Sequence, residues 1–141
     1  MTAVRVVGVA VRRDVDGRRL LLAARRAEVA GVAGVAGWEL PGGKCEPGED
    51  LEGAAVREIR EELGCEVRVL ERLDRVQEIR PGLSLEVVVA AVLAGEPRPL
   101  EHAELRWLAA GDLGSVTWLP ADVPFLADLR PRLTGPVGGA T

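Results

Sequence analysis

Runs of β-branched and alternating apolar residues follow the chain through most of its length and predict strands. Residues 4–11 (VRVVGVAV) form the first run, and a second run covers residues 20–24. The Asp-Gly turn within residues 14–17 joins these two runs into a hairpin. Further strands are expected over residues 65–79, 83–93 and 104–108, the first two of them separated by a Pro-Gly turn.

One segment has a helical period instead. Residues 51–63 repeat apolar side chains at about 100° per residue, with Asp50 placed to cap the start and Gly64 to end the helix. A second helix is predicted over residues 121–129. The buried face of the first helix is expected to consist of Ala55, Val56, Ile59 and Leu63.

The remaining segments are rich in glycine and proline and predict connections. Residues 27–37 are expected to form a loop, residues 38–43 (WELPGG) a short strand that runs into a turn, and residues 95–100 a linker. Residues 134–141 have nothing to bury and predict a disordered tail. Interleaved strands and helices without a strict βαβ repeat predict a single α/β domain over residues 1–133, built as a sandwich around a mixed sheet.

Composition limits the classes of partner. Of the 141 residues 48% are apolar and 28% are charged, which is ample for a packed core, and the net charge of −4 argues against a nucleic-acid duplex or an anionic membrane. No apolar run approaches the ~20 residues of a membrane span, and no signal peptide is visible, so we expect a cytoplasmic protein. Cys45 and Cys65 lack a CxxC partner and predict reduced thiols.

Glu58, Glu61 and Glu62 lie beside the apolar face of the predicted helix. Like charges at this spacing destabilise an isolated helix by roughly 0.2–0.5 kcal/mol per pair. One interpretation is an ordinary solvated face, paired with Arg57 and Arg60. The other is a binding site for a hard divalent cation such as Mg²⁺, because carboxylate oxygens on a rigid helix beside a glycine-rich turn suit such a cation and leave it open to phosphates.

The stretch from Gly43 to Cys65 resembles the Nudix box of the Nudix hydrolases. It consists of Gly43, five residues, Glu49, seven residues and then REIREELGC, which matches the fixed glycine and polar positions of that motif. The one departure is Cys65 in place of an aliphatic residue, and a buried thiol behaves as a small hydrophobe. The resemblance implies hydrolysis of a nucleoside diphosphate linked to another group, with Mg²⁺ or Mn²⁺, on an α/β/α sandwich.

The resemblance also implies roles for individual residues. Arg57 would orient the glutamates, and Glu49 would support the start of the helix. Glu104 is close enough to Glu101 to compete with it as general base or additional metal ligand. The implied metal ligands are Gly42, Glu58, Glu61, Glu62 and Glu101. The implied catalytic residues are Arg57, Glu58, Glu61 and Glu101.

Outside the box the chain is similar to the MutT-like branch, which cleaves nucleoside triphosphates to the monophosphate and pyrophosphate. The similarity lies in AARR (23–26), WELPGGK (38–44), EHAELRWL (101–108) and LPADVPFL (119–126). The substrate-binding residues that it implies are Arg25 or Arg26, Glu39, Lys44 and Asp122. Among these Lys44 is the weaker phosphate ligand, because a lone loop lysine is commonly just solvated.

Asp122 bears on the choice of base. Members of the branch that act on oxidised guanine nucleotides usually have asparagine there, whereas an ionised aspartate can only accept hydrogen bonds. An acceptor suits a base with an exocyclic amino group, so cytidine nucleotides are favoured alongside oxidised guanine nucleotides. Alternatively, Asp122 only caps the last helix. Trp38, Trp107 and Trp118 are expected to pack in the core or at its rim, and His102 to be an exposed loop residue without a role.

Three other functions stay open at this point. The substrate could be a dinucleotide or a sugar nucleotide, which the box alone does not exclude. A nucleotide-binding regulator on the same scaffold would be expected to have lost box glutamates, and an isomerase of isoprenoid diphosphates to have a longer chain and an altered box. The chain shows none of these changes, so we favour a nucleotide hydrolase.

Overall fold

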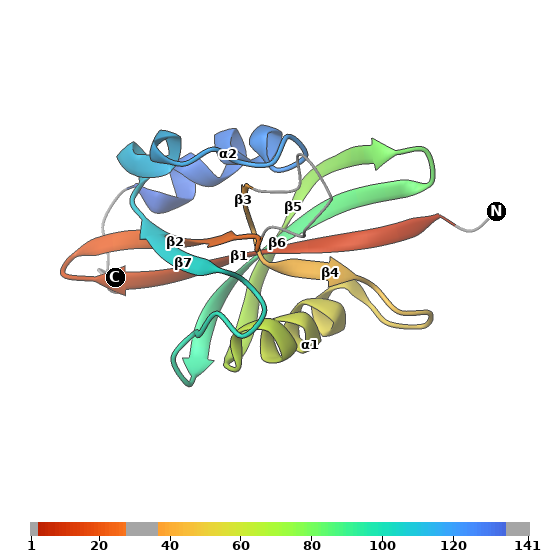
Figure 1. The fold of residues 1–141 in the computed structure, drawn as a ribbon, viewed down its shortest axis with the longest axis horizontal. Coiled ribbons are helices and arrows are strands. Elements are labelled where there is room, and N and C mark those ends of the chain that lie inside the picture. Colours follow the sequence, from red (N-terminus) through yellow and green to blue (C-terminus); the bar gives the residue numbers. More distant parts are fainter. Residues whose placement is uncertain (1–2, 28–36, 135–141) are drawn as a thin grey trace.

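The computed structural model describes residues 3–27 and 37–134, which fold around a seven-stranded mixed sheet (Figure 1). The strands β1 (Val4–Val15) and β2 (Arg18–Arg25) form the predicted hairpin. Strand β1 also pairs in parallel with β6 (Leu83–Ala94), which in turn pairs antiparallel with β5 (Glu66–Arg80). Strand β7 (Glu104–Leu108) pairs antiparallel with β2, so every predicted strand is present.

The β1–β2 hairpin opens into a fork that holds residues 38–44. Strand β3 (Trp38–Glu39) pairs with the end of β2, while β4 (Gly42–Lys44) pairs with residues 6–8 of β1. Between them, the Pro41 carbonyl accepts a hydrogen bond from the Val9 backbone at 2.7 Å. The predicted turn at residues 41–43 was therefore wrong in part, because the free edge of β1 offers backbone partners that make Gly42 and Gly43 strand residues.

Two α-helices lie on opposite faces of the sheet (Figure 1). Helix α1 (Leu51–Leu63) has the predicted bounds: Asp50 accepts a hydrogen bond from the Gly53 backbone at 2.7 Å, and Gly64 ends the helix with a φ of 67°. Helix α2 (Val123–Leu129) begins later than the predicted residue 121, because residues 120–122 form a turn. The 3₁₀ helices η1 (Ala110–Ser115) and η2 (Arg130–Leu133) flank it.

The core consists of two apolar clusters, one on each face of the sheet. Side chains alternate along β1, so that Val9 packs in the cluster under α1 and Ala10 in the cluster under α2. Ile59 fixes α1 to the first cluster, and Phe125 fixes α2 to the second. This arrangement is the predicted α/β/α sandwich.

The tryptophans are packing residues, as predicted. Trp38 and Trp118 are buried in the cluster under α2, and the Trp118 indole donates a hydrogen bond to the Leu113 carbonyl at 2.7 Å. Trp107 packs against the other cluster, with the Arg13 guanidinium 4.1 Å from its ring centre. Both cysteines are free thiols.

Two predictions fall outside the described residues. Most of the loop expected over residues 27–37 and most of the tail expected over residues 134–141 belong to the segments 28–36 and 135–141. Within residues 3–27 and 37–134, no helix is long and apolar enough to cross a membrane.

Candidate active site

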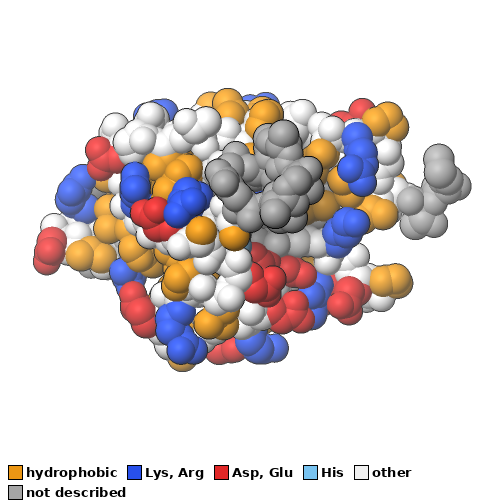
Figure 2. All heavy atoms as spheres, viewed as in Figure 1, with side chains coloured by type: hydrophobic (Ala, Val, Ile, Leu, Met, Phe, Trp, Pro, Cys, Tyr) orange, Lys and Arg blue, Asp and Glu red, His pale blue; other side chains and the backbone are white. Residues whose placement is uncertain are grey.

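Helix α1 carries three glutamates along the edge of its buried face. The side chain of Glu62 is 9% exposed and that of Glu58 is 15% exposed, whereas that of Glu61 is 54% exposed. Glu62 is thus part of the buried face, which the sequence had assigned to apolar residues alone. Figure 2 shows acidic side chains gathered over the region of α1 and β4.

Arg57 ties this helix to the segment before it. Its Nε and Nη2 donate to the two carboxylate oxygens of Glu49, both at 2.8 Å, and Nη2 also donates to the Lys44 carbonyl at 3.0 Å. Its Nη1 donates to Glu58 at 2.8 Å and to Glu61 at 3.3 Å. The hydrogen bonds that Arg57 donates to Glu49 lower the pKa of Glu49 to about 2, and the bonds that Glu49 and Glu58 accept raise the pKa of Arg57. Glu49 therefore stays ionised and in place.

Two adjacent glycines of β4 leave room for these contacts in different ways. A Cβ on Gly42 would lie 1.9 Å from the Val7 carbonyl oxygen, and its φ of 153° is unfavourable for other residues. A Cβ on Gly43 would lie 2.4 Å from a Glu58 carboxylate oxygen. Gly42 thus permits the pairing of β4 with β1, while Gly43 lets the Glu58 carboxylate lie directly against the backbone.

Glu62 is the most buried of the three α1 glutamates. Its Oε2 atom has no hydrogen-bond partner among the described residues. Burial and the neighbouring carboxylate of Glu58 both raise the pKa of Glu62, and the charges of Glu39 and Glu101 add to this effect. In the described chain no three acidic, histidine or cysteine side chains already have the spacing of a metal centre. An unpaired buried oxygen beside further carboxylates nevertheless fits a hard divalent cation, whose charge would offset their repulsion.

The segment before β7 is attached to the end of α1. The backbone N–H groups of Arg98 and Leu100 donate to the last carbonyls of the helix, those of Leu63 at 2.9 Å and Glu62 at 3.1 Å. The next residue, Glu101, is exposed and close enough to influence Glu62. Its competitor Glu104 is engaged by Arg25 at 3.3 Å and Arg106 at 3.1 Å. Of the two carboxylates, Glu101 is therefore the one available to the site.

His102 is not the exposed residue that was expected. Its side chain is only 5% exposed, and its Nε2 lies 3.0 Å from Glu39 Oε2 and 3.7 Å from Glu62 Oε1. No local pattern indicates this burial, because the contacts join β3, α1 and a loop that are far apart in the chain. A histidine next to a glutamate at the start of the EHAELRWL segment was the one available signal.

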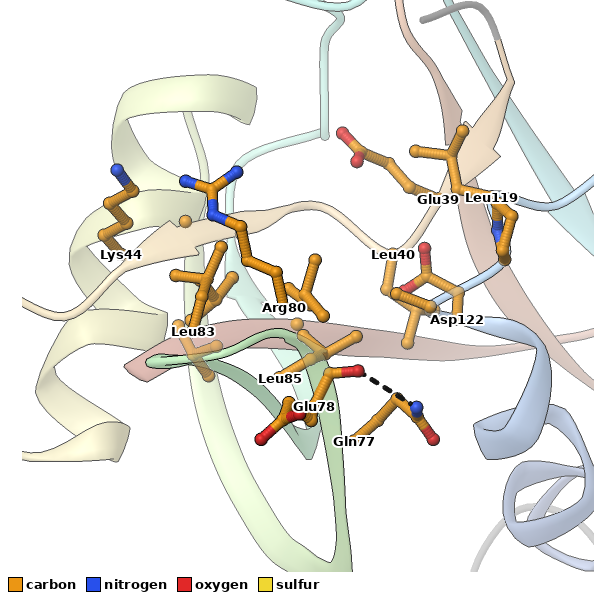
Figure 3. A pocket seen from close by; sticks show the side chains of 18 of the residues that line it. Glu39, Leu40, Lys44, Gln77, Glu78, Arg80, Leu83, Leu85, Leu119 and Asp122 are labelled. Atoms are coloured by element: carbon orange, nitrogen blue, oxygen red, sulfur yellow. Dashed lines mark hydrogen bonds between the residues drawn. The ribbon is translucent and has the colours of Figure 1, made fainter. Parts of the chain in front are cut away.

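A cavity of about 660 Å³ lies beside these carboxylates and has two chemically different ends. In Figure 3 the side chains of Lys44 and Arg80 lie together at one end, near α1, and those of Glu39 and Asp122 lie at the other. Apolar side chains also line the cavity, including Leu40, Leu83, Leu85 and Leu119. Such a cavity suits a molecule with an anionic part and a flat hydrogen-bonding part.

Asp122 does not act as a helix cap. Although it immediately precedes α2, its side chain makes no capping hydrogen bond within the described residues, and it is buried at the wall of the cavity. Burial, together with the charge of Glu39, raises the pKa of Asp122 to about 7. Near neutral pH it is present both as a carboxylate and as a carboxylic acid, so the assumption that it can only accept hydrogen bonds needs correction.

The basic residues of the cavity differ in part from the predicted ones. Arg26 lines it and pairs with Glu39 at 3.2 Å, but Arg25 is not among the described residues of its wall and instead contacts Glu104. Lys44 lines the cavity, and so does Arg80, which was not among the residues expected from the sequence. Arg80 ends a long strand with several other arginines, and no local pattern distinguishes it from them.

Comparisons with known proteins agree with this geometry. A family model described as "NUDIX domain" matches residues 2–133. A Mycobacterium tuberculosis protein named "Putative 8-oxo-dGTP diphosphatase 2" is 41% identical over 118 residues, 82% of each chain. The CTP pyrophosphohydrolase of Escherichia coli K12 is 35% identical over 128 residues, 89% of this chain and 90% of that protein. The solution structure of the E. coli ORF135 protein, 33% identical, superposes with a TM-score of 0.72 over 94% of each chain.

Proposed function

This chain belongs to the Nudix hydrolases, enzymes that cleave phosphoanhydride bonds in nucleotide substrates, and from that premise we propose that it converts a nucleoside triphosphate to the monophosphate and pyrophosphate. The favoured substrates are cytidine or oxidised guanine nucleotides. The observation that carries the proposal is the two-ended cavity, which joins a basic end beside the α1 carboxylates to an acidic end suited to a base. The names of the M. tuberculosis and E. coli relatives support the same two substrate classes.

The metal-binding part of the proposal concerns Mg²⁺ or Mn²⁺. The residues proposed to hold it are Gly42, through its carbonyl oxygen, and the carboxylates of Glu58, Glu61, Glu62 and Glu101. The cation, when bound, neutralises phosphate charge and polarises the phosphoanhydride. Arg57 keeps Glu49, Glu58 and Glu61 in position, because it already donates to all three. Lys44 and Arg80 bind phosphate oxygens of the substrate.

The chemical step is in-line attack of a water molecule on phosphorus, with the P–O bond to the leaving phosphate group breaking. Glu101 accepts the proton of the attacking water, since it is the exposed carboxylate of this segment that is free of an arginine partner among the described residues. At the other end, Glu39 and Asp122 bind the hydrogen-bonding edge of the base. Their carboxylate oxygens accept from an exocyclic amino group, as in cytosine or guanine.

A substrate panel tests the proposal. Purified protein with Mg²⁺ or Mn²⁺ is assayed for pyrophosphate and orthophosphate release from CTP, dCTP, dGTP and 8-oxo-dGTP. Cleavage of ADP-ribose, a dinucleotide and a UDP-sugar is measured in parallel, because these are the alternative substrates. We expect monophosphate and pyrophosphate from the cytidine or oxidised guanine nucleotides, and no product when EDTA removes the metal. Cleavage confined to the dinucleotide or the sugar nucleotides would instead assign a different Nudix substrate.

A charge-neutral substitution on α1 tests the role of the glutamates. Glu61→Gln should lower kcat on the order of 10²–10³-fold, because one of the carboxylates proposed to hold the charge-neutralising cation is lost. Its melting temperature should stay close to that of the wild type, because the Glu61 side chain is 54% exposed.

The matched control is Glu52→Gln, the same chemical change on an exposed residue in the first turn of the same helix. We expect this variant to keep wild-type turnover. Equal turnover for Glu61→Gln and Glu52→Gln would remove Glu61 from the proposed metal site.

A further inference from the structure

His102 occupies a position between the two halves of the proposed site. Its Nε2 is 3.0 Å from Glu39 Oε2 on the side of the base-binding end and 3.7 Å from Glu62 Oε1 on the side of the α1 carboxylates. The ring therefore lies next to one carboxylate from each half of the site. Nothing in the Nudix-box resemblance assigns a function to this residue.

Backbone hydrogen bonds anchor the loop on both sides of His102. Before His102, Leu100 donates to the Glu62 carbonyl at 3.1 Å, and after it, Ala103 donates to the Arg25 carbonyl at 2.9 Å. Two backbone anchors within four residues leave the intervening loop little freedom. The backbone at His102 is consequently attached to both α1 and the sheet, and the 5% exposure of its side chain leaves the imidazole little room to move.

The carboxylate of Glu39 has two partners of unequal rigidity. Oε1 pairs with Arg26 at 3.2 Å, and the Arg26 side chain is 48% exposed. Oε2 meets His102, whose side chain is 5% exposed. A half-exposed arginine can change rotamer at small cost, whereas a buried ring between two backbone anchors cannot. The orientation of Glu39 in the cavity therefore depends on His102.

We infer that His102 is a positioning residue for base recognition: its Nε2–H donates to Glu39 and holds that carboxylate at the base-binding end of the cavity. The inference rests on the proposed function, since it assigns a reason for substrate choice within it. The proton lies on Nε2 because a carboxylate oxygen accepts and does not donate. His102 itself touches neither the phosphates nor the reacting atoms in this assignment.

Two substitutions of His102, whose side-chain amides extend to different distances, test its hydrogen bond to Glu39. The side-chain amide nitrogen of glutamine lies near the position of histidine Nε2, and that of asparagine lies near Nδ1. His102→Asn should therefore lose the bond to Glu39, raise KM for the preferred nucleotide and reduce its kcat/KM advantage over the other nucleotides by roughly 10-fold, with kcat changed far less. His102→Gln should restore most of that discrimination.

A double-mutant cycle shows whether His102 acts through Glu39. If it does, the combined Glu39→Gln, His102→Asn protein should discriminate between nucleotides no worse than Glu39→Gln alone. A purely structural role would instead lower kcat equally for every nucleotide and leave the preference unchanged. That result, or full additivity of the two substitutions, would overturn the inference.

A second readout does not need turnover. His102 is the only histidine of the chain, so ¹⁵N-histidine labelling of tag-free protein gives a single imidazole in the NMR spectrum. We expect the proton on Nε2, a shift of its signal in Glu39→Gln, and a further shift when a nucleoside monophosphate is added without metal. An imidazole signal insensitive to both would refute the positioning role even if hydrolysis is observed. Absence of hydrolysis with these shifts present would refute the proposed reaction instead.

Discussion

At Asp122 a single carboxyl group links substrate recognition to stability. The group lies at the base-binding end of the cavity, and its pKa is raised to about 7 by burial and by the charge of Glu39. In the unfolded chain an aspartate ionises near its ordinary value of about 3.9. Between these two values the folded state retains a proton that the unfolded state has lost, so folding becomes less favourable as pH rises through this window.

We therefore expect Asp122→Asn to gain stability relative to the wild type as pH rises from 4 to 8. A shift from 3.8 to about 7 corresponds to a difference of up to about 4 kcal/mol at 1.36 kcal/mol per unit. Urea unfolding of both proteins across this range measures it. A stability difference that does not vary with pH would show that Asp122 ionises normally in the folded protein.

The same substitution should change the preference among bases more than the overall rate. Asparagine both donates and accepts at every pH, whereas Asp122 donates only in its protonated form. The substrate panel repeated with Asp122→Asn at pH 6 and pH 8 measures this. An unchanged profile at both pH values would remove Asp122 from base recognition.

At the scale of elements, β4 and α1 together form the proposed catalytic unit. The adjacent glycines of β4, Gly42 and Gly43, allow the close packing around it. Helix α1 could be predicted to the residue because its signals are local: an Asp50 cap, an apolar period and Gly64. Strand β4 could not, because its partners on β1 are more than thirty residues away and glycine has no preference for strands. The contacts of His102 and Arg80 were missed for the same reason. They depend on which loops meet in space.

The two glycines should separate stability from activity. Gly42→Ala drives a Cβ into the Val7 carbonyl and strains the backbone, so we expect a loss of about 2–5 kcal/mol in unfolding free energy. Gly43→Ala meets only the movable carboxylate of Glu58, so the unfolding free energy should stay within about 1 kcal/mol of the wild-type value.

For Gly43→Ala the expected loss is in activity, about 10–100-fold in kcat, because Glu58 is displaced. Thermal unfolding and steady-state kinetics of both variants provide the comparison. If Gly43→Ala retained full activity, the position of Glu58 against β4 would be irrelevant to catalysis.

At the scale of the whole molecule, one sheet serves two apolar clusters. The sandwich could be predicted from the interleaved strands and helices, and its α/β/α form from the resemblance to the Nudix hydrolases. The sequence did not predict which helix covers which face, because that depends on the parallel pairing of β1 with β6. It also missed the fork that holds residues 38–44.

Because both clusters share the strands of one sheet, we expect them to unfold in one transition. Ile59→Ala under α1 and Phe125→Ala under α2 should destabilise the protein by about 2–5 and 3–5 kcal/mol, respectively. Their effects should add in the double variant, since the two side chains pack in different clusters. Calorimetry of the four proteins tests this, and two resolved transitions would show that the halves fold independently.

The fork between β1 and β2 sets the distance between the two ends of the cavity. Glu39 and Lys44 stand at opposite ends of the cavity, yet both belong to the same short ribbon, fastened on one side by Trp38 and on the other by Cys45 through backbone bonds of 2.8 to 2.9 Å. These bonds attach both ends of the ribbon to neighbouring segments of the fold. The spacing between Glu39 and Lys44 is then constant. The distance from the base to each phosphate of a bound nucleotide, as well as the identity of the base, would decide which phosphoanhydride bond lies next to the α1 carboxylates.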